Sequence, residues 1–143
     1  MTTALRERPS CGMESETGSR SSADYDILVV EDDEDCREVL CSLLGSEGYR
    51  VQAAASGAEA LDALARMSKP PRFVLLDLIM PGMSGFEFLR AMRRAPALAA
   101  TPVVVHSGVC EDPELDALRK VERWLRKPVT VDALLEITRE LTR

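Results

Sequence analysis

Short apolar runs alternate with amphipathic stretches along most of the chain, beginning near Asp24. Apolar runs predict strands at residues 27–30, 49–53, 73–76, 103–105 and 123–125. Apolar residues at helical spacing predict helices at residues 36–44, 58–67, 85–94, 113–120 and 131–141. Strands that are apolar along their whole length are typical of parallel sheets covered by helices on both faces. The pattern therefore predicts an α/β fold with a doubly wound five-stranded parallel sheet of flavodoxin-like order 2-1-3-4-5.

The sequence also indicates where the first helix begins and ends and where the folded domain begins. Asp35, followed three positions later by Glu38, is typical of a helix N-terminus, and Gly45 is a residue that commonly ends helices. Residues 1–23 lack periodic apolar positions and are rich in Ser, Thr, Glu, Arg and Gly. We therefore expect a disordered tail over residues 1–23 and one folded domain over residues 24–143.

The composition narrows the class of protein. A net charge of −6 argues against electrostatic binding to nucleic acid. The apolar runs are too short to span a bilayer, and the N-terminus has no secretory signal, so we expect no membrane association. The four cysteines form no CxxC pair, which favours free thiols in a reducing cytoplasm.

Polar side chains follow the predicted strands at their carboxyl ends. In chain order they are Glu31 and Asp32, Asp77, His106 and Ser107, and Lys127. Ligands of doubly wound sheets bind at the carboxyl ends of the strands, near the point where the strand order reverses. We therefore expect carboxylates, a hydroxyl and a lysine to gather at one edge of the sheet.

Three carboxylates at one place need a compensating charge. Two carboxylates about 4 Å apart repel by about 4 kcal/mol at an effective dielectric near 20. Either one of them stays protonated or a cation binds. Hard oxygen ligands suit Mg²⁺, which also draws phosphate into an anionic site. Taken singly, these residues are ordinary loop acids, turn formers and surface lysines, so it is their convergence that indicates a site.

The segments carrying these residues resemble the receiver domain of two-component response regulators, of the stand-alone chemotaxis type. They are ILVVEDDED at 27–35, GYRVQAAASGAEAL at 48–61, LLDLIMPGMSGFEFL at 75–89, TPVVVHSG at 101–108 and LRKPV at 125–129. The segments occur in the family's order, and the resemblance spans essentially the whole expected domain.

The resemblance implies a role for each matching residue. Asp77 is implied as the phosphoacceptor, which receives a phosphoryl group from a histidine kinase with Mg²⁺ as cofactor. The implied metal ligands are Glu31, Asp32, Asp77 and the backbone carbonyl of Ile79. Ser107 and Lys127 are implied to bind the phosphoryl group, and Trp124 falls at the aromatic switch position.

Three features depart from the family pattern. Ser107 and Lys127 are 20 positions apart, about two fewer than is usual in the family, and the segment Leu118-Arg119-Lys120-Val121 lacks the usual small-residue turn. We expect a shortened segment before the last strand, which puts the usual output face in doubt. His106 replaces an apolar residue, and strand alternation points it away from Ser107, which favours a face or core histidine over a phosphocarrier.

These features predict a single-domain signalling switch and not an enzyme. The only reactions we expect it to catalyse are the transfer of a phosphoryl group to itself and the hydrolysis of that group. Because the chain ends soon after the last helix, we expect a sensor kinase or phosphotransfer protein upstream and a target protein downstream. A phosphorelay intermediate and a phosphate sink stay open. An aspartyl-nucleophile phosphohydrolase is disfavoured because Ile79 stands where that chemistry places a second acid, and a flavin carrier because residues 31–35 are acidic.

Overall fold

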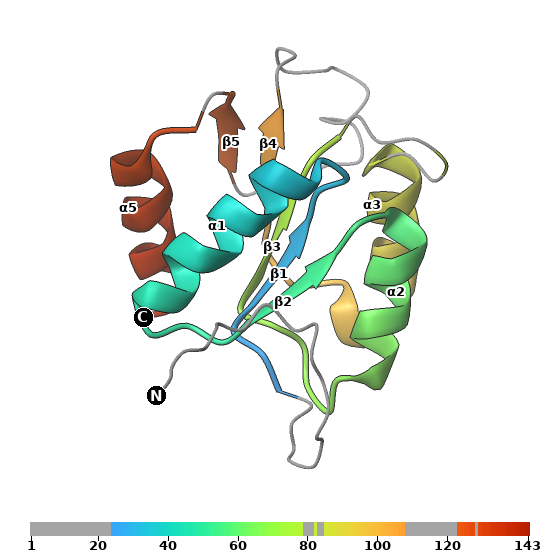
Figure 1. The fold of residues 1–143 in the computed structure, drawn as a ribbon. Coiled ribbons are helices and arrows are strands. Elements are labelled where there is room, and N and C mark those ends of the chain that lie inside the picture. Colours follow the sequence, from blue (N-terminus) through green and yellow to red (C-terminus); the bar gives the residue numbers. More distant parts are fainter. Residues whose placement is uncertain (1–23, 79–81, 83–84, 108–122, 128) are drawn as a thin grey trace, which may run out of the picture.

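The computed structural model describes residues 24–78, 82, 85–107, 123–127 and 129–143 (Figure 1). Its strands are β1 (Ile27–Val30), β2 (Val51–Ala54), β3 (Phe73–Leu76), β4 (Val103–Ser107) and β5 (Arg123–Arg126). Its helices are α1 (Glu34–Ser46), α2 (Gly57–Arg66), α3 (Gly85–Arg94), α5 (Val131–Leu141) and a short 3₁₀ helix, η1 (Pro96–Leu98). The expected tail at 1–23 and the expected helix at 113–120 lie outside the described residues.

The five strands form one parallel sheet in the order β2-β1-β3-β4-β5, as the sequence predicts. The register aligns Ala54, Val30, Leu76, Val105 and Trp124 in one row across the sheet. Residues just beyond this row therefore share the carboxyl edge of the sheet.

Helices cover both faces of the sheet, with α1 and α5 on one face and α2 and α3 on the other (Figure 1). Alternate residues of β1 and β3 belong to opposite core clusters: Val30 and Leu76 pack with α2 and α3, whereas Val29 and Leu75 pack with α1 and α5. All residues of both strands are buried. Burial on both faces explains why these strands are apolar without alternation.

The boundaries of α1 differ from the prediction. Asp33, not Asp35, is the N-cap, because its carboxylate accepts a 2.8 Å hydrogen bond from the backbone N–H of Cys36. The helix continues through Gly45 to Ser46. The glycine that the connection to β2 needs is Gly48, whose φ of +96° lies in the left-handed region.

Three strands also differ at their ends. β2 begins at Val51, two residues later than expected, and ends one residue later, at Ala54. β4 runs to Ser107, two residues further than expected, and β5 to Arg126, one residue further. The additional β4 residues pair with β5, with His106 opposite Leu125. Polar residues at the end of β4 therefore belong to the sheet itself, which fixes their backbone.

Candidate functional site

The parallel hydrogen bonding continues one residue beyond β1 and β3 and fixes two acids at the edge of the sheet. The backbone N–H of Glu31 donates to the carbonyl of Ala54, and that of Asp77 donates to the carbonyl of Val30, each at 3.0 Å. Glu31 is 1% exposed and Asp77 is 4% exposed. Two carboxyl groups are thus buried side by side at the strand ends, as the sequence predicts.

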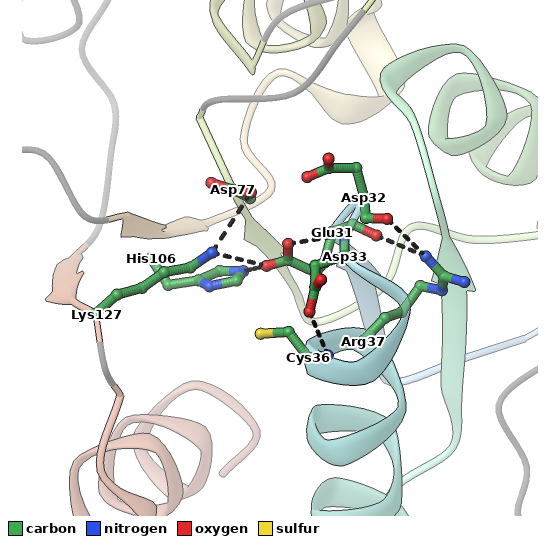
Figure 2. A network of polar contacts seen from close by, with 8 residues as sticks. All are labelled: Glu31, Asp32, Asp33, Cys36, Arg37, Asp77, His106 and Lys127. Atoms are coloured by element: carbon green, nitrogen blue, oxygen red, sulfur yellow. Dashed lines mark hydrogen bonds and ion pairs between the residues drawn. The ribbon is translucent and has the colours of Figure 1, made fainter.

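Asp32 completes a cluster of three carboxylates with these two acids (Figure 2). One carboxylate oxygen from each of Glu31, Asp32 and Asp77 lies within 4.8 Å of the other two. Asp32 is exposed and opens the cluster to solvent. A set of three hard oxygen donors, accessible from one side, fits a cation such as Mg²⁺ that keeps part of its water shell.

Lys127 connects two of the acids. Its Nζ donates to Oε1 of Glu31 at 3.1 Å and lies 3.5 Å from Oδ2 of Asp77. Burial by itself lowers the pKa of Lys127, but the hydrogen bond to Glu31 and the charge of Asp77 outweigh it, so the pKa is raised. The lysine is therefore charged at neutral pH and offsets part of the repulsion within the cluster.

Glu31 stays ionised although it is buried. Burial alone would raise its pKa, but the backbone N–H of Asp33, 3.1 Å from Oε2, and the Lys127 ammonium outweigh that effect and lower the pKa. A guanidinium nitrogen of Arg37 donates to the backbone carbonyls of Glu31 and Asp32 at 3.0 and 3.4 Å. The first turns of α1 thus hold both the carboxylate and the loop that carries it.

The imidazole of His106 points toward the carboxylate of Glu31 (Figure 2). It is fully buried, and its Nε2 lies 3.7 Å from Oε1 of Glu31. Burial lowers the pKa of His106 to about 4, so the ring is neutral at pH 7. The predicted face or core position is confirmed, whereas the contact with Glu31 is one that sequence reasoning missed. The signal for it was a polar residue where the family pattern has an apolar one.

Cys36, which lies beside the site, is a free thiol, as the sequence predicts, and Cys41 is buried in the core beneath α1. Burial, together with the nearby Glu31 carboxylate, raises the pKa of Cys36 to about 11. The thiol is therefore protonated at neutral pH and is a poor nucleophile. Cys11 and Cys110 lie outside the described residues.

Gly85 sets the distance between α3 and the segment after Asp77. Its backbone N–H donates to the carbonyl of Leu78 at 3.0 Å. A Cβ atom at this position would lie 2.6 Å from Cα of Leu78 and 3.0 Å from the carbonyl oxygen of Asp77. Only glycine fits this approach, and sequence reasoning did not single out this residue.

The other predicted site residues are placed as follows. Ile79 lies outside the described residues, and Ser107 is the last residue of β4, with a side chain that is likewise outside them. Trp124 lies in β5 opposite Val105, and its ring packs, partly buried, against the core cluster beneath α2 and α3. Trp124 is thus on the opposite face of the sheet from His106.

Residues 27–139 match the family model for the response regulator receiver domain. The chain belongs to this family. It is 34% identical over 120 residues to an uncharacterised 14.6 kDa protein of Leptolyngbya boryana, covering 82% of this chain and 90% of that protein. It is 32% identical over 114 residues to PilH of Pseudomonas aeruginosa, covering 77% of this chain and 91% of PilH.

Solved receiver structures share the fold. The chemotaxis protein CheY4 of Vibrio cholerae superposes with a TM-score of 0.75 at 27% identity, covering 83% of this chain and 99% of CheY4. The sheet order, the family match and the structural similarity together make this chain a receiver domain of two-component signalling. In the described part of the chain, no helix is both long enough and apolar enough to cross a membrane.

Proposed function

We propose that this receiver domain is a phosphorylation switch in which Asp77 accepts a phosphoryl group from a sensor histidine kinase or a phosphotransfer protein. The observation that carries the proposal is the buried Asp77 carboxylate, held beside two further acids and 3.5 Å from the Lys127 ammonium. A carboxylate oxygen of Asp77 attacks the phosphorus, and a P–O bond forms as the P–N bond to the donor histidine breaks. The electron pair of that bond leaves with the imidazole nitrogen. Water attack on the acyl phosphate resets the switch.

The proposed cofactor is Mg²⁺, held by Glu31, Asp32, Asp77 and the backbone carbonyl of Ile79. The three carboxylates fit it because they supply oxygen donors within 4.8 Å of one another. When bound, the cation would neutralise the acids and attract the phosphoryl oxygens.

Lys127 has a proposed role that follows from its present contacts. Its ammonium is shared between Glu31 and Asp77, so it already lies beside the oxygen that would carry the phosphoryl group. Negative charge on the equatorial oxygens of the transition state would attract this ammonium without a long movement. The Ser107 hydroxyl is the proposed second donor to the phosphoryl group, and Trp124 the proposed aromatic switch.

Output from this cytoplasmic single-domain regulator is proposed to run through contacts with a target protein. Support comes from PilH and CheY4, which this chain covers along 91% and 99% of their lengths. A phosphorelay intermediate and a phosphate sink share the same chemistry at Asp77 and differ only in where the phosphoryl group goes next.

The test is intact-mass analysis after incubation with acetyl phosphate and Mg²⁺. We expect one alkali-labile phosphoryl adduct on the wild type, none on Asp77→Asn, and much less on Asp32→Asn, which should also lose most Mg²⁺ binding. Asp62→Asn is the matched control, because Asp62 is 71% exposed on α2 and should not affect the adduct. An undiminished adduct on Asp77→Asn would place the acceptor elsewhere and refute the proposal.

A further inference from the structure

The imidazole of His106 lies against Glu31 of the acidic cluster (Figure 2) and is a polar ring in a buried position. It is 0% exposed, its Nε2 lies 3.7 Å from Oε1 of Glu31, and among the described residues neither ring nitrogen has a hydrogen-bond partner. Burying a polar ring without partners is costly, and an apolar side chain would avoid that cost. A polar ring at this position is therefore expected to have a role that an apolar side chain could not fill, and a hydrogen-bond donor beside a carboxylate is such a role.

The surrounding charges decide which of the two ring nitrogens of His106 carries the proton. Lys127 already supplies a positive charge to Oε1 at 3.1 Å, and the imidazole is fully buried, where an uncharged ring is favoured over a second cation. A neutral imidazole has one N–H donor and one lone-pair nitrogen. Facing a carboxylate oxygen, an Nε2–H attracts and an Nε2 lone pair repels, so the Nε2–H tautomer is the favoured one.

We propose that His106 is a positioning residue for the metal and phosphoryl site, which it serves by presenting its Nε2–H to the carboxylate of Glu31. This inference rests on the proposed function of Asp77 and Mg²⁺. The backbone N–H of Asp33 holds Oε2 of Glu31, while Oε1 faces both Lys127 and His106. A shift of about 0.5 Å brings Nε2 within hydrogen-bonding distance of Oε1.

The arrangement lets Lys127 move. When a phosphoryl group on Asp77 draws the Lys127 ammonium, Oε1 of Glu31 loses its charged donor while the carboxylate remains buried. His106 and the thiol of Cys36 are then the side-chain donors that remain beside that carboxylate among the described residues. His106 keeps Glu31 oriented toward the other acids in both states of the switch. The ring cannot itself receive a phosphoryl group, because no phosphodonor reaches a side chain with no exposed surface.

The first test uses the unmodified protein. His106 is the only histidine in the sequence, so a long-range ¹H–¹⁵N spectrum shows a single imidazole. We expect a neutral ring at pH 7 with the proton on Nε2. A ring protonated on Nδ1 instead would overturn the proposal. This measurement needs neither Mg²⁺ nor phosphorylation, so it is independent of the proposed function.

The second test compares His106→Gln with His106→Met by Mg²⁺ titration. The two replacements have similar length, but only glutamine carries an N–H donor near the position of Nε2. Partners of metal ligands typically change metal affinity about 10–100-fold. We expect His106→Met to bind Mg²⁺ about tenfold more weakly and His106→Gln to stay within about threefold of the wild type. Wild-type affinity in His106→Met, or an equal loss in both variants, would overturn the positioning role.

Asp32→Asn in the same titration separates the two proposals. If Asp32→Asn binds Mg²⁺ as the wild type does, the proposed metal site fails. If it loses binding while His106→Met keeps wild-type affinity, the positioning role alone fails. Urea unfolding in EDTA is the folding control, and should one variant not fold, the tautomer of the wild-type ring still decides the proposal.

Discussion

A buried carboxylate is stable only where its charge is satisfied, and Glu31 meets this condition through residues distant in sequence. Its Oε2 accepts from the Asp33 backbone and its Oε1 from Lys127, 96 positions away. Because these donors lower the pKa of Glu31, ionisation of this group favours the folded state. The contribution of Glu31 to the free energy of unfolding is fully present above its unfolded-state pKa of about 4.3. It is lost as the pH falls through the lower pKa that Glu31 has in the folded state.

Replacing Lys127 by Met tests how much the Lys127 ammonium contributes to keeping the buried Glu31 carboxylate stable. Glu31 would remain buried with the backbone N–H of Asp33 but without the ammonium, so less would offset the effect of burial and the pKa of Glu31 would rise. A buried charged group that loses a partner costs about 1–3 kcal/mol or more, and we expect the lower part of that range because Lys127 is 30% exposed. Urea unfolding in EDTA should show this loss near pH 7.

The loss should shrink as the pH falls below about 4, where Glu31 is protonated in the variant and its charge no longer opposes folding. Lys69→Met is the matched control, because Lys69 is exposed and its replacement should change the free energy of unfolding by less than about 0.5 kcal/mol. An equal loss for Lys127→Met at both pH values would show that Glu31 is not the group responsible.

At the scale of the element, the position of α3 depends on one glycine. The helix begins at Gly85 directly against the backbone of Asp77 and Leu78, where a Cβ would come within 2.6 Å of a backbone atom. The obstacle is main chain, not the flexible end of a side chain, so it can yield only if the helix or the segment after Asp77 moves.

Gly85→Ala should therefore destabilise the protein by about 1–3 kcal/mol, the usual cost of overpacking. It should also reduce phosphoryl acceptance, since the displaced backbone belongs to Asp77 itself. Gly45→Ala is the opposite case: Gly45 lies within α1, and its Cβ would meet nothing within 4 Å. Alanine there should stabilise by up to about 1 kcal/mol, because helix interiors disfavour glycine. Thermal unfolding of both variants tests the pair, and equal shifts would contradict it.

At the scale of the whole molecule, the sheet places the proposed phosphoacceptor and the single tryptophan at one end of the core. Trp124 is in register with Val105 of β4 and Leu76 of β3, the residue just before Asp77. Its ring is partly buried against the cluster that also contains Leu76 and Val105. A rearrangement at the end of β4 would therefore change the surroundings of the indole.

Tryptophan emission should report the proposed switch. We expect beryllofluoride with Mg²⁺ to shift the emission to shorter wavelength, because drawing the Ser107 segment toward Asp77 frees space into which the ring packs. Mg²⁺ alone should have little effect, and Asp77→Asn should abolish the shift. If beryllofluoride binds, as shown independently, and the emission does not change, Trp124 is not part of the switch.

The local pattern of the sequence determined the fold class and the three acids of the candidate site. The helices at 85–94 and 131–141 and the strands at 27–30 and 73–76 were predicted with the bounds they have, because burial imposes a periodicity that the sequence must carry. Glu31 and Asp77 were found because each directly follows a buried strand, Asp32 because it is the next residue after Glu31, and parallel strands end at one edge of the sheet. The order of the strands is the predicted flavodoxin-like one, one of the two orders common in doubly wound sheets.

Only the tertiary structure decided how those acids are held. The choice of Asp33 over Asp35 as the cap depended on where the chain leaves β1, since both are acids before the same helix. The pairing of Lys127 with Glu31, the contact of His106 with the same carboxylate and the close approach of Gly85 to Leu78 join separate elements. Periodicity records which face of an element is buried, whereas these contacts depend on atomic distances between elements, which no local pattern encodes.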